Sequence, residues 1–179
     1  NDGTLYRQGG DFVSQMDTDS GIVIYRTTGG MIQDYNNPGN DYYHLTIDTQ
    51  GFSIENDLTL AGNLTFTGSG MLSTGSCNLD ITGNVSGTGT LAGGTGDISV
   101  TGNITISAYS ATSGTTTVSG NWSITTFTHN NGNVVFNNSG SLTSTDFRDF
   151  EMTAGTRTLS GAITIENDAA ITGGILDTS

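Results

Sequence analysis

The sequence is short of cysteine, proline and lysine, and these shortages exclude several kinds of site. It has one cysteine (Cys77), one proline and no lysine among its 179 residues. A single cysteine excludes an intrachain disulfide and an all-cysteine metal site. Without lysine there is no Schiff base, no lysine-to-asparagine cross-link and no P-loop lysine. No run of about 18 apolar residues is present, so we expect no membrane insertion.

Positive charge is also scarce. Four arginines stand against 17 aspartates and glutamates, which gives a formal net charge of −13 at pH 7. A protein that binds nucleic acid or an anionic membrane needs a basic face that collects phosphates. Scattered arginines in so acidic a chain cannot build one, so we expect no nucleic-acid partner.

Small residues dominate instead. Gly (27), Thr (31), Ser (18) and Asn (16) make up just over half of the chain. These residues disfavour long helices, because glycine loses most backbone entropy and the short polar side chains compete for backbone hydrogen bonds. The chain is therefore either a flexible, disordered segment or an all-β protein.

An internal repeat decides between these two. A nine-residue pattern with a central glycine recurs with a slightly varying period of about 20 residues. The second residue after the glycine is always apolar, and the third is always threonine or serine. The glycines are Gly62, Gly83, Gly102, Gly120, Gly140 and Gly161, and the apolar residues are Leu64, Val85, Ile104, Trp122, Leu142 and Ile163.

Alternating residues indicate a strand with one buried face. Strands that recur about every 20 residues, with like residues in register, are typical of a coil in which each turn lies on the previous one. In an antiparallel sandwich, consecutive strands run in opposite directions, so equivalent residues of successive repeats would not lie on one another. We therefore predict an all-β, right-handed parallel β-helix (β-solenoid) of roughly nine turns, each of about 20 residues. The four asparagines that follow the glycine should form an amide ladder at a bend: Asn63, Asn84, Asn103 and Asn121.

Two regions are expected. Residues 1–40 would form N-terminal turns with a loop insertion near Asp34–Asn40, which holds the only proline, and would serve as a cap or docking region. Residues 41–179 would form the regular solenoid. Because residues 43–47 resemble residues 147–152, this region is expected to hold one module of about 105 residues plus part of the next.

The repeats from residue 22 to 179 resemble the long, repetitive, surface-exposed or secreted β-solenoid proteins of bacteria, which are adhesin-like. The pattern that carries the resemblance is L-x-L-x-G-N-L-x-φ, where φ is apolar, as in residues 58–66. The resemblance implies an extracellular or cell-surface address and a structural role as a stalk, adhesin segment or self-assembling fibre subunit. Its partners would be copies of itself, joined head to tail, or neighbouring modules of a longer chain, and surface glycans. It supplies no catalytic residues, since those families share none.

The alternative is a carbohydrate-binding or carbohydrate-processing β-helix protein. A solenoid enzyme would need clustered carboxylates, and three or more convergent acids with a basic residue in a groove would indicate one. Acids are sparse between Gly62 and Gly140, and the two histidines, His44 and His129, are far apart in the sequence. We therefore expect no enzyme activity and no catalytic residues. The column of threonine and serine suggests ice binding, but its mixed composition and the varying turn length disfavour that.

Calcium is the one cofactor with candidate ligands. Asp17 and Asp19 alternate with other oxygen-bearing residues in residues 17–21, but the remaining ligands of an EF-hand are missing. Glu55 and Asp57 belong to the sequence Ile-Glu-Asn-Asp, which returns at residues 165–168. The alternative is that both copies are solvated turns. Cys77 and Trp122 share the parity of buried positions, so both should be core residues.

Overall fold

In the computed structural model, the described residues are 3–8, 19–27, 29–32, 40–143 and 145–178, and all their regular structure is strand. The strands form two sheets, called A and B here. Sheet A contains β1 (Thr4–Arg7), β2 (Ile22–Tyr25), β3 (Gly30–Ile32), β5 (His44–Asp48), β6 (Gly51–Ile54), β8 (Leu64–Thr67), β9 (Met71–Ser73), β11 (Val85–Ala92), β13 (Ile104–Ser110), β15 (Trp122–Thr128), β17 (Gly140–Leu142), β19 (Thr156–Leu159) and β21 (Ile175–Asp177). Sheet B contains β4 (Asn40–Tyr42), β7 (Leu58–Leu60), β10 (Leu79–Ile81), β12 (Ile98–Val100), β14 (Thr115–Val118), β16 (Asn133–Phe136), β18 (Thr145–Met152) and β20 (Ile163–Ile171).

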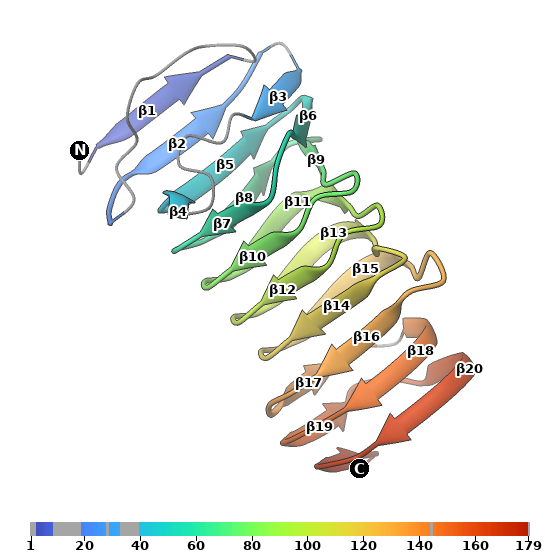
Figure 1. The fold of residues 1–179 in the computed structure, drawn as a ribbon. Coiled ribbons are helices and arrows are strands. Elements are labelled where there is room, and N and C mark those ends of the chain that lie inside the picture. The colour runs from blue at the N-terminus through green and yellow to red at the C-terminus, as the bar shows by residue number, and fades with distance from the viewer. Residues whose placement is uncertain (1–2, 9–18, 28, 33–39, 144, 179) are drawn as a thin grey trace.

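The chain alternates between the sheets and winds into a coil with its ends at opposite ends of the stack (Figure 1). The paired strands are parallel, as in β10 with β7 and with β12. The coil has about eight turns of roughly 19 residues, slightly fewer and shorter turns than the sequence predicts. The predicted fold class is confirmed.

The core is made of the apolar columns that the repeat predicts. Within sheet B, Leu60 pairs with Ile81, and the column continues to Val100 and Val118, all at most 2% exposed. The first five residues of the predicted sheet A column are fully buried: Leu64, Val85, Ile104, Trp122 and Leu142. Each side chain lies directly on the equivalent one of the turn before, so stacking buries what a single turn would expose.

Glycine is required at the corner between the sheets because neighbouring turns approach closely there. A Cβ on Gly83 would lie 2.5 Å from the carbonyl oxygen of Gly62, and one on Gly102 would lie 2.4 Å from that of Gly83. Such contacts are too short for any side chain. The recurrent glycine is therefore explained by this close approach, not by an unusual backbone angle.

The sixth copy of the repeat is out of register with the other five, which corrects the sequence alignment. Gly140 pairs with Arg157, not with Gly161, and Leu142 pairs with Leu159. Ile163 instead lies in sheet B beside Thr145. The physical reason is a shorter turn: the loop of residues 129–132 has no counterpart in β18. Arg148 alone stands there, opposite two residues of β20 at a register shift.

The two segments that suggested the longer repeat lie on different faces of the coil. Residues 44–47 belong to β5 in sheet A, whereas residues 147–152 belong to β18 in sheet B. The loop insertion predicted near Asp34–Asn40 lies outside the described residues, except for Asn40, which begins β4.

Candidate functional site

The predicted asparagine ladder is confirmed. The side-chain oxygen of each asparagine accepts the backbone N–H of the equivalent residue one turn later, at 2.8 Å from Asn84 to Asn63 and from Asn103 to Asn84, and at 2.7 Å from Asn121 to Asn103. His44 begins the ladder, since its Nδ1 accepts the N–H of Asn63 at 2.9 Å. The column therefore serves structure, because its oxygens satisfy backbone groups at the bend.

A second ladder uses one of the calcium candidates. Both oxygens of Asp57 accept from Asn78, at 2.7 Å from the backbone N–H and 3.0 Å from the amide. The side-chain oxygen of Asn78 accepts the N–H of Asp97 at 2.8 Å, and Asp97 accepts that of Thr115 at 2.8 Å. Asp57 therefore holds the next turn in place.

The other calcium candidates do not converge in the described residues. Asp19 accepts a hydrogen bond from the Ser20 hydroxyl at 3.2 Å, and Glu55 lies in the exposed corner after β6. Asp17 lies outside the described residues. Among those described, no three histidine, cysteine, aspartate or glutamate side chains could share a metal ion. Calcium binding stays a prediction.

Asp80 lies near Asp57 and Asp97 on sheet B. Partial desolvation raises the pKa of its carboxyl, and the negative charges of Asp57 and Asp97 raise it further. Cys77 is close by and only partly buried, in contact with the core, and partial burial followed by the charge of Asp57 raises the pKa of its thiol. Trp122 is fully buried, as predicted.

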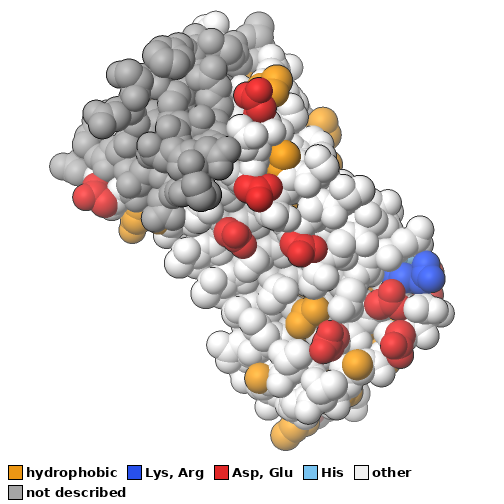
Figure 2. Space-filling model, viewed as in Figure 1, with side chains coloured by type: hydrophobic (Ala, Val, Ile, Leu, Met, Phe, Trp, Pro, Cys, Tyr) orange, Lys and Arg blue, Asp and Glu red, His pale blue; other side chains and the backbone are white. Residues whose placement is uncertain are grey.

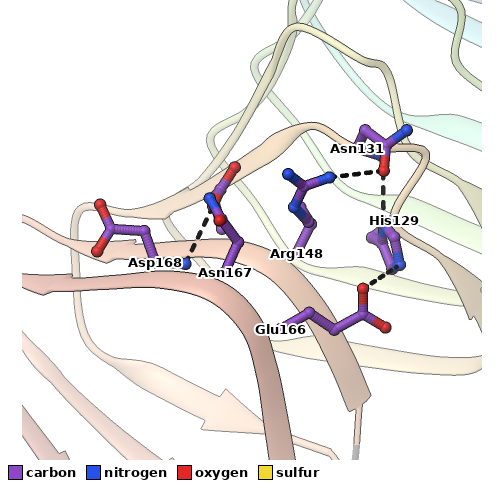
Figure 3. Close-up of polar contacts among 7 residues, drawn as sticks. His129, Asn131, Arg148, Glu166, Asn167 and Asp168 are labelled. Carbon is purple, nitrogen blue, oxygen red and sulfur yellow. Dashed lines mark hydrogen bonds and ion pairs between the residues drawn. The ribbon is translucent and has the colours of Figure 1, made fainter.

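A polar cluster occupies the corner between β15 and β20 (Figure 3). The Nε2 atom of His129 lies 3.3 Å from a carboxylate oxygen of Glu166, and its Nδ1 accepts the N–H of Asn131 at 3.1 Å. Arg148, at the register shift of β18, donates to the side-chain oxygen of Asn131 at 2.9 Å. Both imidazole nitrogens are engaged, so neither is free to take a proton from a substrate in this arrangement.

Beside this cluster is a shallow depression of about 220 Å³ on sheet B, lined by Asn133, Asp149, Phe150, Glu151, Asp168 and Ala170. It gathers three acids on two neighbouring strands. One oxygen of Asp149 is used structurally, since it accepts the N–H of Asp168 at 3.1 Å and the amide of Asn167 at 2.5 Å. Arg148, the residue before Asp149 in the sequence, is directed at Asn131 (Figure 3). Figure 2 shows acidic side chains spread over the visible face, with basic groups in one place only.

Arg157 is a functional side chain that the sequence did not reveal. It is fully buried, and its guanidinium lies 4.5 Å from the centre of the Phe136 ring. It donates to the carbonyl of Val118 at 3.1 Å, to that of Ser119 at 3.2 Å and to that of Gly120. Burial lowers the pKa of the guanidinium to about 10. Arg157 thus reaches past Gly140 and ties together the corner where the asparagine ladder ends.

The spacing of residues by whole turns is the sequence signal that could have revealed two contacts: His129 with Glu166, and Asp149 with Asp168. Asp149 and Asp168 stand one turn apart in the sequence, and His129 and Glu166 stand two turns apart. Comparison with family models, curated proteins and solved structures finds no match for this chain. In the described part of the chain, nothing helical is long and apolar enough to cross a membrane.

Proposed function

We propose that this chain is a structural element outside the cell: a segment of a surface stalk or adhesin, or the subunit of a fibre. The observation that carries the proposal is the continuous parallel stack from β4 to β20, in which the polar corners satisfy the backbone and the core has no break. Such a stack resists bending because neighbouring turns share both hydrogen bonds and core contacts. The extracellular address rests on the resemblance to bacterial surface solenoids.

Antibodies raised against the chain test this role on intact cells of the organism that makes it. Electron microscopy with a gold-labelled antibody should place the label outside the cell envelope, on projections or fibres. A cytoplasmic protein serves as the control and should be labelled only after lysis. Label confined to lysed cells would refute the extracellular proposal.

The partner we propose is another β-solenoid turn, stacked on the C-terminal end. Ile171 is 51% and Ile175 63% exposed there, and Leu159, Ile163 and Leu176 are only partly buried. The turn would come from a neighbouring module of a longer chain or from a second copy joined head to tail. Analytical ultracentrifugation of the purified chain across a wide concentration range distinguishes the two sources. Only association with a second copy makes the sedimentation coefficient rise with protein concentration.

We propose a structural role in preference to catalysis. Among the described residues, those that line the sheet B depression include acids but no basic side chain, and both imidazole nitrogens of His129 are already engaged. A second function, carbohydrate binding, is favoured by one separate observation: a notch on sheet A with a half-buried aromatic ring and polar groups at its rim.

A further inference from the structure

The notch lies where sheet A loses a partner strand. β13 and β15 pair at six positions, from Trp122 to Thr128. The next strand, β17, is only three residues long and pairs with β15 at Trp122 alone among the described residues. β18 then begins at Thr145 and pairs with β16 and β20, not with β15. The second half of β15 therefore borders an opening of about 270 Å³, lined by Ile124, Thr125, Thr126, Phe127, Thr145 and Asp146.

The floor of the notch is aromatic. Phe127 belongs to the inward column of sheet A, in which Leu72, Leu91 and Tyr109 of the preceding turns are at most 1% exposed. Phe127 is only half-buried, because no strand pairs with this half of β15 on the following turn. Its ring packs against Trp122, at 5.0 Å between centroids, and against Tyr109 and Phe147, each at 5.7 Å, so only the part of the ring that these three leave uncovered borders the notch.

The rim of the notch is polar and has unused hydrogen-bonding capacity. Thr125, Thr126 and Asp146 are exposed, and within the described residues their side chains make no hydrogen bond. Thr145 behaves differently, because its hydroxyl accepts the indole N–H of Trp122 at 3.2 Å. The notch thus offers two hydroxyls and one carboxylate around a small apolar area, to which Phe127 contributes.

We propose that this notch binds one neutral pyranose ring of a glycan. A pyranose has an apolar face that packs on an aromatic ring and equatorial hydroxyls that donate to a carboxylate, so it matches both parts of the notch. The volume is below the roughly 300 Å³ at which pockets for larger ligands begin, which limits the occupant to one ring. Acidic sugars and phosphates are repelled by Asp146 and by the net charge of −13.

The inference rests on the second proposed function and is independent of the structural role. Trp122 provides the readout, because it is the only tryptophan and its indole N–H bonds to Thr145 in the wall of the notch. A ¹⁵N-labelled sample should therefore give a single indole signal. Methyl glycosides of glucose, galactose and mannose are the probes, and the methyl glycoside of glucuronic acid is the charged control.

We expect at least one neutral glycoside to shift the indole signal saturably, with a Kd of about 1 mM or weaker, as suits so small a ligand. The glucuronide should give no shift. Asp146→Ala should weaken binding at least about tenfold, and Thr126→Val by a smaller factor. Both residues are exposed, so the variants should keep the wild-type melting temperature. Asp80→Ala, on the other sheet, is the matched control and should bind like the wild type.

Two outcomes would overturn the proposal: no saturable shift with any of the three neutral glycosides, or equal affinity in the wild type, Asp146→Ala and Thr126→Val. Neither outcome touches the structural role, which the antibody experiment tests separately. Conversely, labelling confined to lysed cells would refute the extracellular stalk and leave binding at the notch standing.

Discussion

The turns from β7 to β16 and the turns from β17 to β21 differ in charge and in regularity. Residues 58–136 contain two charged side chains, Asp80 and Asp97, whereas residues 140–177 contain eight, and the first set is the more regular. In the first set the asparagine ladder runs unbroken and the sheet B columns stay in register, while sheet A has one register shift, between Gly87 and Thr90 of β11. In the second, Arg148 alone stands in place of a loop, Ser141 takes the ladder position after Asn121, and Arg157 fills the corner. The polar cluster, the acidic depression and the notch all involve residues from this second set.

The difference in regularity between the two sets of turns has a single geometric origin. Thr115 pairs with Asn133, and Asn133 pairs in turn with Asp149, so the second of these two turns is shorter than the first. A turn that loses residues cannot follow the outline of the turn before it, so β15 loses pairing along its second half. Regular turns provide length and stiffness, whereas the irregular turn leaves half of β15 without a partner strand on the following turn and Phe127 only half-buried.

The largest expected effect compares two residues, Ile104 and Ile163, that the sequence repeat aligns but the structure places in different sheets. Ile104→Asp should bury an unpaired carboxylate in the core and cost at least about 4 kcal/mol. Ile163→Asp should cost only roughly 1–2 kcal/mol, because Ile163 is partly exposed in the irregular region. Urea unfolding measures both. Thr105→Asp, on the exposed face beside Ile104, is the control and should be nearly neutral. Equal costs at residues 104 and 105 would show that the column assignment is wrong.

Much of the regular region could be predicted from the sequence, since the apolar columns and the corner asparagines recur at regular intervals in the amino-acid sequence. The pairing of Leu159 with Leu142 could not be predicted from the sequence, because a lost loop changes the register without leaving a sequence signal at Leu159. The burial of Arg157 could not be predicted either, because its guanidinium donates to three carbonyl groups of residues 118–120, which lie two turns away in the sequence. The notch depends on the absence of pairing, which no local pattern encodes.

The second prediction compares the two described arginines of the irregular region that follow β17. Arg157→Ala should cost about 2–4 kcal/mol, because it leaves the carbonyls of the buried corner without their donors. Arg148→Ala should change stability by no more than about 0.5 kcal/mol, since its one described contact is exposed. Chemical denaturation measures both variants. Similar small losses for both would mean that Arg157 does not stabilise the corner.

The third prediction concerns the ladder of the regular region. Asn103→Ala removes the oxygen that accepts the N–H of Asn121 and should cost about 1 kcal/mol. Asn103→Asp keeps an oxygen at the same position and should recover part of the loss. Asn137→Ala is the control, because this exposed asparagine lies after β16, outside the ladder, and makes no side-chain hydrogen bond within the described residues. A melting temperature that falls equally for residues 103 and 137 would contradict a stabilising ladder.

The smallest effect concerns charge along the regular turns. Since desolvation and the charges of Asp57 and Asp97 raise the pKa of Asp80 in the folded protein, its ionised form is disfavoured by folding. Stability should therefore fall as the pH rises from below the ordinary pKa of 3.8 through the raised value, and the penalty persists at pH 7. Asp80→Asn removes this penalty, so at pH 7 it should raise the melting temperature slightly. The gain in free energy of unfolding should be less than about 0.5 kcal/mol, because the side chain is exposed. At pH 3 the two proteins should melt together, since Asp80 is then mostly protonated in both the folded and the unfolded state. A stabilisation of equal size at both pH values would assign the effect to strand propensity, not to charge.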